Sequence, residues 1–284
     1  MVLAAPLSNS KSPALARLLN DAEREAWREL VENRCGTYFA DGRFHVLESR
    51  IFERMRILGE SARQRYYNLV LADRNEWNHL LTALLNGDTA FFRHPDSFEA
   101  LRQLVFPNFD RERPASIWCA GCSTGEEVYS IASLALQCGV DRVRVMGSDL
   151  NENALAKARA GVYGRADGIG GFRRTARGLA PGDVLKSAVS FEQRNLLDVE
   201  TYPANQDLIW CQNVLIYCRD GIRSRIVAGF EKSLRPGGYL LLSPVDAMSV
   251  RPVSLELVRA GLAAQPPNLR LNVPLFEKTL RQTK

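Results

Sequence analysis

After residue 113 the chain alternates short apolar runs with helical segments, and this alternation limits the fold more than any other feature. Strand–helix alternation predicts a doubly wound α/β sheet of mostly parallel strands. The run at 272–277 is predicted to be a late antiparallel edge strand, and the Gly/Arg-rich residues 161–182 a loop. The strands are predicted at 116–120, 143–147, 188–191, 208–211 and 239–243, and the helices at 126–138, 153–160 and 220–234.

The first third of the chain has a different pattern, without runs of β-branched residues. Apolar positions recur at helical spacing over 14–31, 43–58 and 76–85, which predicts a small all-α domain. We therefore expect a disordered tail at 1–13, a helical domain at 14–86, a linker at 87–113 and an α/β domain at 114–284.

Composition places the chain among ordinary globular proteins. Hydrophobic residues make up 46% and charged residues 24%, and no run of about 18 apolar residues could span a membrane. The N-terminal residues do not have the order of a signal peptide. The net charge of +5 lies in residues 201–284, with 11 basic against 6 acidic side chains. This surplus is compatible with an acidic protein partner and does not require nucleic acid.

The six cysteines include a CxxC at Cys119 and Cys122, which is compatible with redox or metal chemistry. A zinc site would need two more ligands, and the chain has only three histidines. Free cysteines are more often small apolar residues near buried strands. We expect no metal site, and thiols of this kind fit a reducing cytoplasm.

A glycine loop follows the first predicted strand, where the carboxyl ends of parallel strands form ligand sites. Gly-Cys-Ser-Thr-Gly (121–125) lets the backbone approach a ligand closely. It lacks the lysine of a phosphate-binding P-loop and the third glycine of a dinucleotide fingerprint. Acidic Glu126 and Glu127 would repel phosphate and favour a cationic or amine-bearing ligand such as S-adenosylmethionine.

Further polar residues follow the next strands. Asp149 ends the second strand, where a carboxylate can accept hydrogen bonds from both ribose hydroxyls or cap the next helix. Asn195 and Leu196 are candidates for the border of an adenine ring. The segment 212–217 is not the Asn/Asp-Pro-Pro-Tyr/Phe of nucleic-acid amino-methyltransferases, which argues against base methylation.

Four segments in order resemble the CheR-type chemoreceptor glutamate methyltransferases. The resemblance runs from about residue 27 to residue 277 and implies a Rossmann-like SAM-methyltransferase sheet behind an all-α domain. Thr-x-Phe-Phe-Arg upstream of a Ser-Thr-Gly-Glu-Glu loop is a specific combination. The four segments are Gly-Asp-Thr-Ala-Phe-Phe-Arg (87–93), Cys-Ser-Thr-Gly-Glu-Glu-Val-Tyr-Ser (122–130), Gly-Ser-Asp-Leu-Asn (147–151) and Cys-Gln-Asn-Val-Leu-Ile-Tyr (211–217).

The resemblance implies S-adenosylmethionine as cofactor, S-adenosylhomocysteine as product and a site to which the linker 87–113 contributes. Arg93 would pair with the cofactor carboxylate, although an ordinary surface arginine is the alternative. Glu127 would meet the ammonium, and its neighbour Glu126 could trade roles with it. The implied cofactor-binding residues are Thr89, Arg93, Gly121, Glu126, Glu127, Asp149, Asn195, Leu196, Gln212 and Asn213.

The implied reaction is methylation of glutamate side chains on a chemoreceptor-type protein. A glutamate carboxylate with a pKa near 4.3 is ionised at neutral pH, so no general base is needed. Tyr217 and Arg93 are the implied catalytic residues, with Tyr217 orienting the carboxylate, facing the sulfonium or simply closing a strand end. Methylation of another acceptor and a low-turnover SAM/SAH-binding regulatory module are the alternatives.

The chain also departs from the family pattern. Gly87 replaces the usual asparagine and Gln212 a frequent arginine, which removes polar contacts at the rim of the cofactor site. The segment 163–191 resembles a shortened form of one in which some members insert a small sheet that docks a receptor tail, so tail docking is not expected. Two arginine groups are candidates for receptor contact or are solvated surface: Arg43, Arg50 and Arg54 along one helix stripe, and Arg173, Arg174 and Arg177 in the predicted loop.

Overall fold

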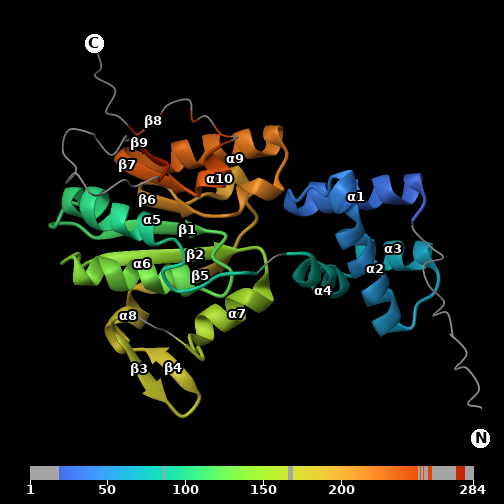
Figure 1. The fold of residues 1–284 in the computed structure, drawn as a ribbon, viewed down its shortest axis with the longest axis horizontal. Helices are drawn as coiled ribbons and strands as arrows, with labels where there is room; N and C mark the ends of the chain where they lie inside the picture. Colours follow the sequence, from blue (N-terminus) through green and yellow to red (C-terminus); the bar gives the residue numbers. More distant parts are fainter. Residues whose placement is uncertain are drawn as a thin grey trace, which may run out of the picture.

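The computed structural model describes residues 19–85, 87–165, 169–248, 250, 252, 255–257 and 273–278. A group of helices lies beside an α/β body built on one large sheet, as Figure 1 shows. The predicted tail at 1–13 lies outside the described residues. The helical group consists of α1 (Asp21–Cys35), η1 (Asp41–Arg43), α2 (Phe44–Leu58), α3 (Arg63–Ala72) and α4 (Arg74–Leu84).

Helix α1 begins later than the helix predicted over 14–31. Residues 14–18 lie outside the described residues, and Asn20 caps the helix. The Asn20 side chain accepts from the backbone N–H of Glu23, while the Glu23 carboxylate accepts from the N–H of Asn20, a reciprocal capping box. At the other end Gly36 takes a left-handed conformation with φ 77°, so the helix ends there and the chain turns towards the sheet.

The helical core contains a buried polar network that the sequence did not reveal. Glu76 of α4 accepts both guanidinium bonds of Arg54, at 3.0 and 2.6 Å, and the Tyr66 hydroxyl at 2.8 Å. Burial and the Glu76 carboxylate raise the pKa of the Tyr66 hydroxyl. The Arg54 side chain is 14% exposed. Arg54 therefore ties α2 to α4 and is not part of an exposed stripe with Arg43 and Arg50.

A seven-stranded sheet forms the α/β body, in the order β5-β2-β1-β6-β7-β9-β8. Strands β1, β2, β5, β6 and β7 are parallel, and β9 is antiparallel to both of its neighbours. The antiparallel strand was predicted at the edge; it lies instead between β7 and β8. The bounds are β1 (Ala115–Ala120), β2 (Val143–Asp149), β5 (Val189–Gln193), β6 (Gln206–Cys211), β7 (Leu234–Leu242), β8 (Leu255–Leu257) and β9 (Leu275–Lys278).

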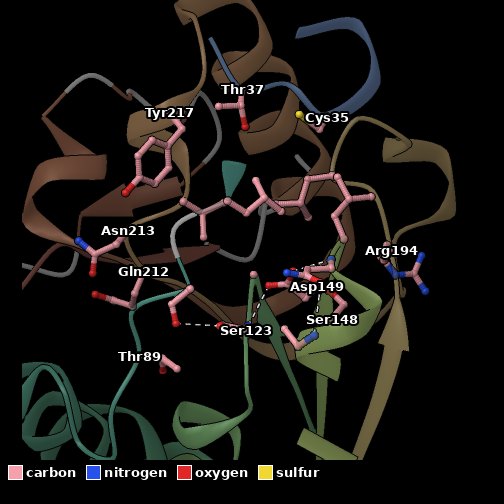
Figure 2. Close-up of a pocket in the computed structure, with 18 of the residues that line it drawn as sticks. Cys35, Thr37, Thr89, Ser123, Ser148, Asp149, Arg194, Gln212, Asn213 and Tyr217 are labelled. Carbon is pink, nitrogen blue, oxygen red and sulfur yellow. Dashed lines mark hydrogen bonds between the residues drawn. The ribbon is translucent and has the colours of Figure 1, made fainter. Parts of the chain in front are cut away.

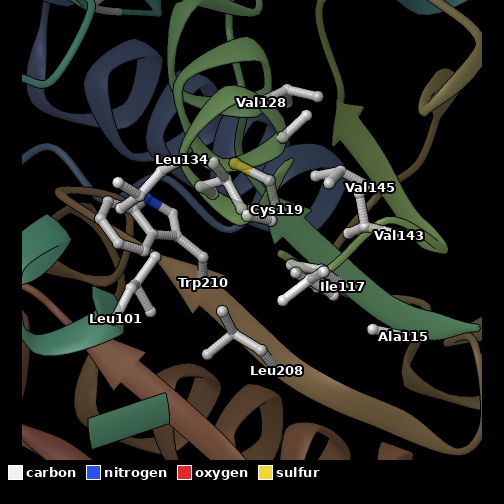
Figure 3. Close-up of a cluster of buried hydrophobic side chains, with 14 of the residues drawn as sticks. Leu101, Ala115, Ile117, Cys119, Val128, Leu134, Val143, Val145, Leu208 and Trp210 are labelled. Atoms are coloured by element: carbon white, nitrogen blue, oxygen red, sulfur yellow. The ribbon is translucent and has the colours of Figure 1, made fainter. Parts of the chain in front are cut away.

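Two hydrophobic clusters cover the two faces of this sheet, because alternate strand residues point to opposite sides. In β1, Ile117 and Cys119 join the cluster of Figure 3, beneath α5 and α6. Trp118 and Ala120 join the cluster beneath α9. The helices of this body are α5 (Pro95–Ala100), η2 (Leu101–Val105), η3 (Phe106–Asn108), α6 (Glu126–Gln137), α7 (Glu152–Ala160), α8 (Asp183–Ser187), η4 (Val199–Thr201), η5 (Leu215–Tyr217), α9 (Asp220–Ser233) and α10 (Pro244–Ala247).

The segment 161–182, predicted as a loop, contains an antiparallel hairpin, so that prediction was wrong. Strands β3 (Phe172–Thr175) and β4 (Gly178–Pro181) pair to form a small second sheet. The hairpin projects below the main sheet in Figure 1. It packs against the body through Phe172, which meets the rings of Phe91, Tyr129 and Tyr163. A small sheet is therefore present where the resemblance suggested a shortened segment.

Within the described residues, no helix combines the length and the apolar character needed to cross a bilayer.

Candidate functional site

The largest concentration of predicted site residues lies in one pocket at the carboxyl ends of β1, β2 and β6. The C-terminal end of α1 and the segment after α4 close it from the side of the helices, through Cys35, Thr37 and Leu85. The pocket brings together Thr89, Arg93, Gly121, Glu127, Asp149, Asn195, Leu196, Gln212, Asn213 and Tyr217.

Figure 2 shows how the side chains are distributed across this pocket. One side carries amide and hydroxyl groups, and the other a carboxylate and a guanidinium. The first side is formed by Thr89, Gln212, Asn213 and Tyr217, and the second by Ser148, Asp149 and Arg194.

The glycine loop after β1 lines the pocket and packs tightly against the segment after β6. Gly121 has φ 80°, and a Cβ atom there would lie 2.4 Å from Cγ2 of Val214. The N–H groups of Gly121 and Cys122 both donate to the carbonyl of Ser148, at 2.8 and 2.9 Å. The loop is thus tied to the end of β2, and only glycine fits at its first position.

The Asp149 carboxylate is held by two backbone groups. Oδ2 accepts from the N–H of Ser123 and Oδ1 from the N–H of Asn151, both at 2.8 Å. Burial raises the pKa of Asp149, and these backbone bonds oppose the rise. Helix α7 is capped by Asn151, whose side chain accepts from the N–H of Asn153 and Ala154. Asp149 is not the helix cap, and its carboxylate lines the pocket.

The adjacent residues Glu126 and Glu127 point in different directions. Glu127 lines the pocket, whereas Glu126 does not and accepts from the Thr124 hydroxyl at 2.6 Å. Burial raises the pKa of Glu127 to about 7, while the Trp210 indole and the Arg93 guanidinium oppose the rise. The Trp210 N–H lies close but does not meet the geometry of a hydrogen bond with this carboxylate.

Several pocket residues carry buried polar atoms that have no hydrogen-bond partner among the described residues. Buried polar groups in proteins are almost always paired, so such a cluster suits a polar ligand. A ligand with an ammonium, a carboxylate and hydroxyl groups would pair with these atoms, with Asp149 and with Arg93. The unpaired atoms of the pocket residues are Thr89 Oγ1, Glu127 Oε1, Arg194 Nε, Gln212 Oε1 and Gln212 Nε2.

The loop between β6 and α9, which carries Asn213 and Tyr217, is held from two sides by buried charges. Asp246 of α10 accepts from the N–H of Asn213 at 2.6 Å and of Ile216 at 2.8 Å. On the other side, Arg223 of α9 donates to the carbonyls of Leu215 and Cys218, at 3.1 and 2.6 Å. Sequence reasoning missed Asp246, although Ser243-Pro-Val-Asp246 is a helix N-terminal signal and Ser243 caps α10.

We expect Asp246→Asn to destabilise the protein by about 1–3 kcal/mol, because one N–H of the loop would face an amide donor. Denaturant unfolding measures this. Asp220→Asn is the matched control, since the Asp220 side chain is 91% exposed beside Arg223 and its loss should cost under about 0.5 kcal/mol. Equal midpoints for the two variants would contradict the role of Asp246.

Asn213 is fixed by a side-chain contact as well as by the loop. It has a positive φ of 58°, and its Oδ1 lies 2.7 Å from Nε2 of His94. Arg93, the residue before His94, is exposed at the pocket rim, where its Nη1 donates to the carbonyl of Asp88 at 2.6 Å. The segment 88–94 therefore supplies one wall of the pocket.

The two departures from the family pattern both lie at this pocket. Gly87 has no side chain, and its backbone carbonyl accepts a hydrogen bond from the Ser123 hydroxyl at 3.0 Å. Gln212 is buried with both amide atoms unpaired. Gln212 therefore presents polar atoms to the pocket, whereas Gly87 contributes only backbone. No group of three or more His, Cys, Asp and Glu side chains suited to a metal occurs among the residues that the structure describes.

Comparisons with known proteins show the family of this chain. The family model "CheR methyltransferase, SAM binding domain" matches residues 87–260, and "CheR methyltransferase, all-alpha domain" matches residues 22–85. A chemotaxis protein methyltransferase of Vibrio parahaemolyticus is 28% identical, over 86% of this chain and 95% of its own. One of Salmonella typhimurium is 32% identical, over 84% and 88%. A probable biofilm formation methyltransferase, WspC of Pseudomonas aeruginosa, is 30% identical, over 78% and 56%.

Proposed function

Because this chain belongs to the CheR methyltransferase family and binds S-adenosylmethionine, we propose that it methylates glutamate side chains of a chemoreceptor-type signalling protein. The products are a glutamate methyl ester and S-adenosylhomocysteine. The observation that carries the proposal is the set of unpaired buried atoms on Thr89, Glu127 and Gln212, which surround the same pocket as Tyr217.

We assign the cofactor contacts from the charges and hydrogen-bonding atoms in the pocket. Arg93 holds the carboxylate and Glu127 the ammonium of the amino-acid end, each as a charge-assisted pair. Thr89 and Gln212 supply further hydrogen bonds there. Asp149 accepts from the ribose hydroxyls. At the base end the contacts come from Asn195 and Leu196, while Asn213 lies beside Gln212 on the other side of the pocket.

The proposed reaction requires the protein to position the acceptor carboxylate against the methyl group of the cofactor. When bound, S-adenosylmethionine supplies an electrophilic methyl group on a positively charged sulfur. The glutamate acceptor is already ionised at neutral pH, so the site needs no base to remove a proton. Tyr217 lines the pocket and orients the acceptor carboxylate. The hydrogen bonds that Asp246 and Arg223 make to the backbone of its loop hold Tyr217 in place.

The proposed receptor-facing surface is smaller than the predicted stripe. Arg54 is bonded to Glu76, so it is not available to a receptor. Arg50 is exposed and pairs with Glu53 at 2.9 Å, a weak surface pair. Arg43 is exposed at the start of α2, with its guanidinium 5.3 Å from the centre of the Tyr217 ring. We propose that Arg43 and Arg50 face the receptor.

Transfer of a labelled methyl group to a purified cytoplasmic chemoreceptor fragment tests the function. We expect label that is released as methanol by mild base and is lost when the receptor glutamates are changed to glutamine. Stable label on RNA or on a small carboxylic acid, with none on the receptor, would contradict the proposed acceptor. Tight binding of S-adenosylhomocysteine without transfer would indicate a regulatory module.

Glu127 should make cofactor affinity depend on pH. Its pKa is raised to about 7 by burial, so the carboxylate becomes neutral as the pH falls through this value. Only the ionised form attracts the ligand ammonium, which stays protonated over this pH range because the ammonium of a free amino acid titrates at higher pH. We therefore expect S-adenosylhomocysteine to bind roughly five- to tenfold more weakly at about pH 6 than at about pH 7.5, by calorimetry.

Glu127→Gln separates this carboxylate from other titratable groups near the pocket, such as Asp149 and His94. The variant should bind weakly at both pH values, with the difference between them largely removed. An unchanged pH dependence in Glu127→Gln would assign the effect to another group.

A further inference from the structure

A second hollow lies on the far side of Tyr217 from the cofactor pocket, and none of the assignments above uses it as a site. It is lined by Tyr38 and Arg43 from the helical group, by Tyr217, Cys218 and Arg219 from the loop before α9, and by Asp220 at the start of α9. Tyr217 and Cys218 also line the cofactor pocket. These two residues therefore form the wall between the hollow, which we call the acceptor groove, and the cofactor pocket.

The acceptor groove carries two exposed arginines, each placed over an aromatic ring. The Arg219 guanidinium lies 3.8 Å from the centre of the Tyr38 ring, and that of Arg43 lies 5.3 Å from the Tyr217 ring. Aromatic faces fix a guanidinium without neutralising it. The third arginine of the groove, Arg223, is buried and donates to loop carbonyls, so it is structural.

The acidic groups near the groove leave a net positive charge. Glu32 pairs with Arg219 through Nε, at 3.2 Å, and Asp220 pairs with Arg223 at 3.4 Å. Arg43 has no acidic partner among the described residues. The Arg219 side chain is 49% exposed beside Glu32, so its guanidinium is accessible to a second carboxylate.

The occupant that fits this surface is an acidic protein segment. Two separated cations suit carboxylates spaced along a peptide, whereas Glu32 and Asp220 would repel the continuous phosphates of a nucleic acid. We propose that the acceptor groove receives the glutamate-bearing segment of the methyl acceptor, and that Arg219 binds a second carboxylate on that segment while the modified glutamate reaches Tyr217. This inference rests on the proposed function, and it adds Arg219 and Tyr38 as the residues that select the acceptor.

Arg219→Ala and Arg219→Glu test the groove in the full chain, with a purified cytoplasmic chemoreceptor fragment as the acceptor. We expect kcat/KM for the fragment to fall about tenfold in Arg219→Ala, mainly through KM, and about thirtyfold or more in Arg219→Glu. Affinity for S-adenosylhomocysteine should stay within about twofold, since Arg219 does not line the cofactor pocket.

Arg102→Ala is the matched control. The Arg102 side chain is 48% exposed and pairs with Glu99 at 3.5 Å, while that of Arg219 is 49% exposed and pairs with Glu32 at 3.2 Å. Arg102 lies in η2, outside the lining of both cavities. It should leave kcat/KM unchanged, and the acidic-segment proposal is wrong if Arg219→Glu behaves like Arg102→Ala.

Direct binding of the unlabelled fragment by calorimetry distinguishes this inference from the proposed function. Binding that weakens in Arg219→Glu without any methyl transfer supports the groove and rejects the reaction. Methyl transfer that is the same in wild type and Arg219→Glu supports the reaction and rejects the groove. Arg219-dependent binding of duplex RNA, with none of the fragment, rejects both.

Discussion

Replacing Asp149 with alanine should weaken S-adenosylhomocysteine binding by roughly 3–6 kcal/mol, or about 10²- to 10⁴-fold in Kd, for two charge-assisted hydrogen bonds. The carboxylate is partly buried, lines the pocket and is held by the N–H groups of Ser123 and Asn151, so its two oxygens are fixed in position. A fixed acceptor pays little ordering cost when it binds two ribose hydroxyls. Calorimetry gives the affinity.

The same substitution also removes partners of two backbone N–H groups, so lost ribose contacts must be separated from a loosened loop. The 2′-deoxy analogue of S-adenosylhomocysteine makes this distinction. Wild type should bind the analogue more weakly than the parent compound, whereas Asp149→Ala should bind both alike. An equal loss in both proteins would show that Asp149 does not contact the ribose. Asp183→Ala, which removes an exposed carboxylate paired with Arg173, should leave affinity unchanged.

Tyr217→Phe should lower kcat for methyl transfer by about 10²-fold, or roughly 2–3 kcal/mol, because it removes the hydroxyl that we propose orients the acceptor carboxylate. The ring remains, and with it the contact to Arg43. The carbonyl of Tyr217, which accepts from the N–H of Tyr38 at 2.8 Å, is unaffected by the change. Steady-state kinetics with the receptor fragment measure the effect.

Affinity for S-adenosylhomocysteine should change by less than about twofold in Tyr217→Phe, which separates catalysis from binding. Tyr67→Phe is the control; its hydroxyl bonds the Ala26 carbonyl at 3.5 Å, within the helical group. A Tyr217→Phe enzyme with wild-type kcat would mean that the tyrosine only closes the end of the loop.

Much of the fold could be predicted because buried parallel strands and amphipathic helices have clear periodicity. The run at 116–120 corresponds to β1 (Ala115–Ala120), and the helix at 220–234 to α9 (Asp220–Ser233). The hairpin β3–β4 was missed because its strands are short and neither alternates between buried and exposed residues. The position of β9 depends on pairing between distant segments, which local patterns do not encode.

The position of a residue directly after a strand predicted part of the site, and the resemblance supplied Thr89 and Arg93, which precede β1. Glu126 and Glu127 are indistinguishable in the sequence, yet about 100° separates neighbouring residues on a helix, so only Glu127 reaches the pocket. Arg54 occupies a regular stripe with Arg50, but its partner Glu76 comes from another helix. Asp246 lies 33 residues beyond Asn213, and only the fold brings its carboxylate to the loop.

Two hydrogen bonds between the helical group and the α/β body involve residues that line the cofactor pocket. The N–H of Tyr38 donates to the carbonyl of Tyr217, and the Asn195 amide donates to the carbonyl of Arg34 at 2.8 Å. Unfolding of either the helical group or the α/β body would therefore disturb residues that line the pocket. We therefore expect heat to unfold both in a single cooperative transition, and a bound nucleoside to raise the midpoint for the whole chain.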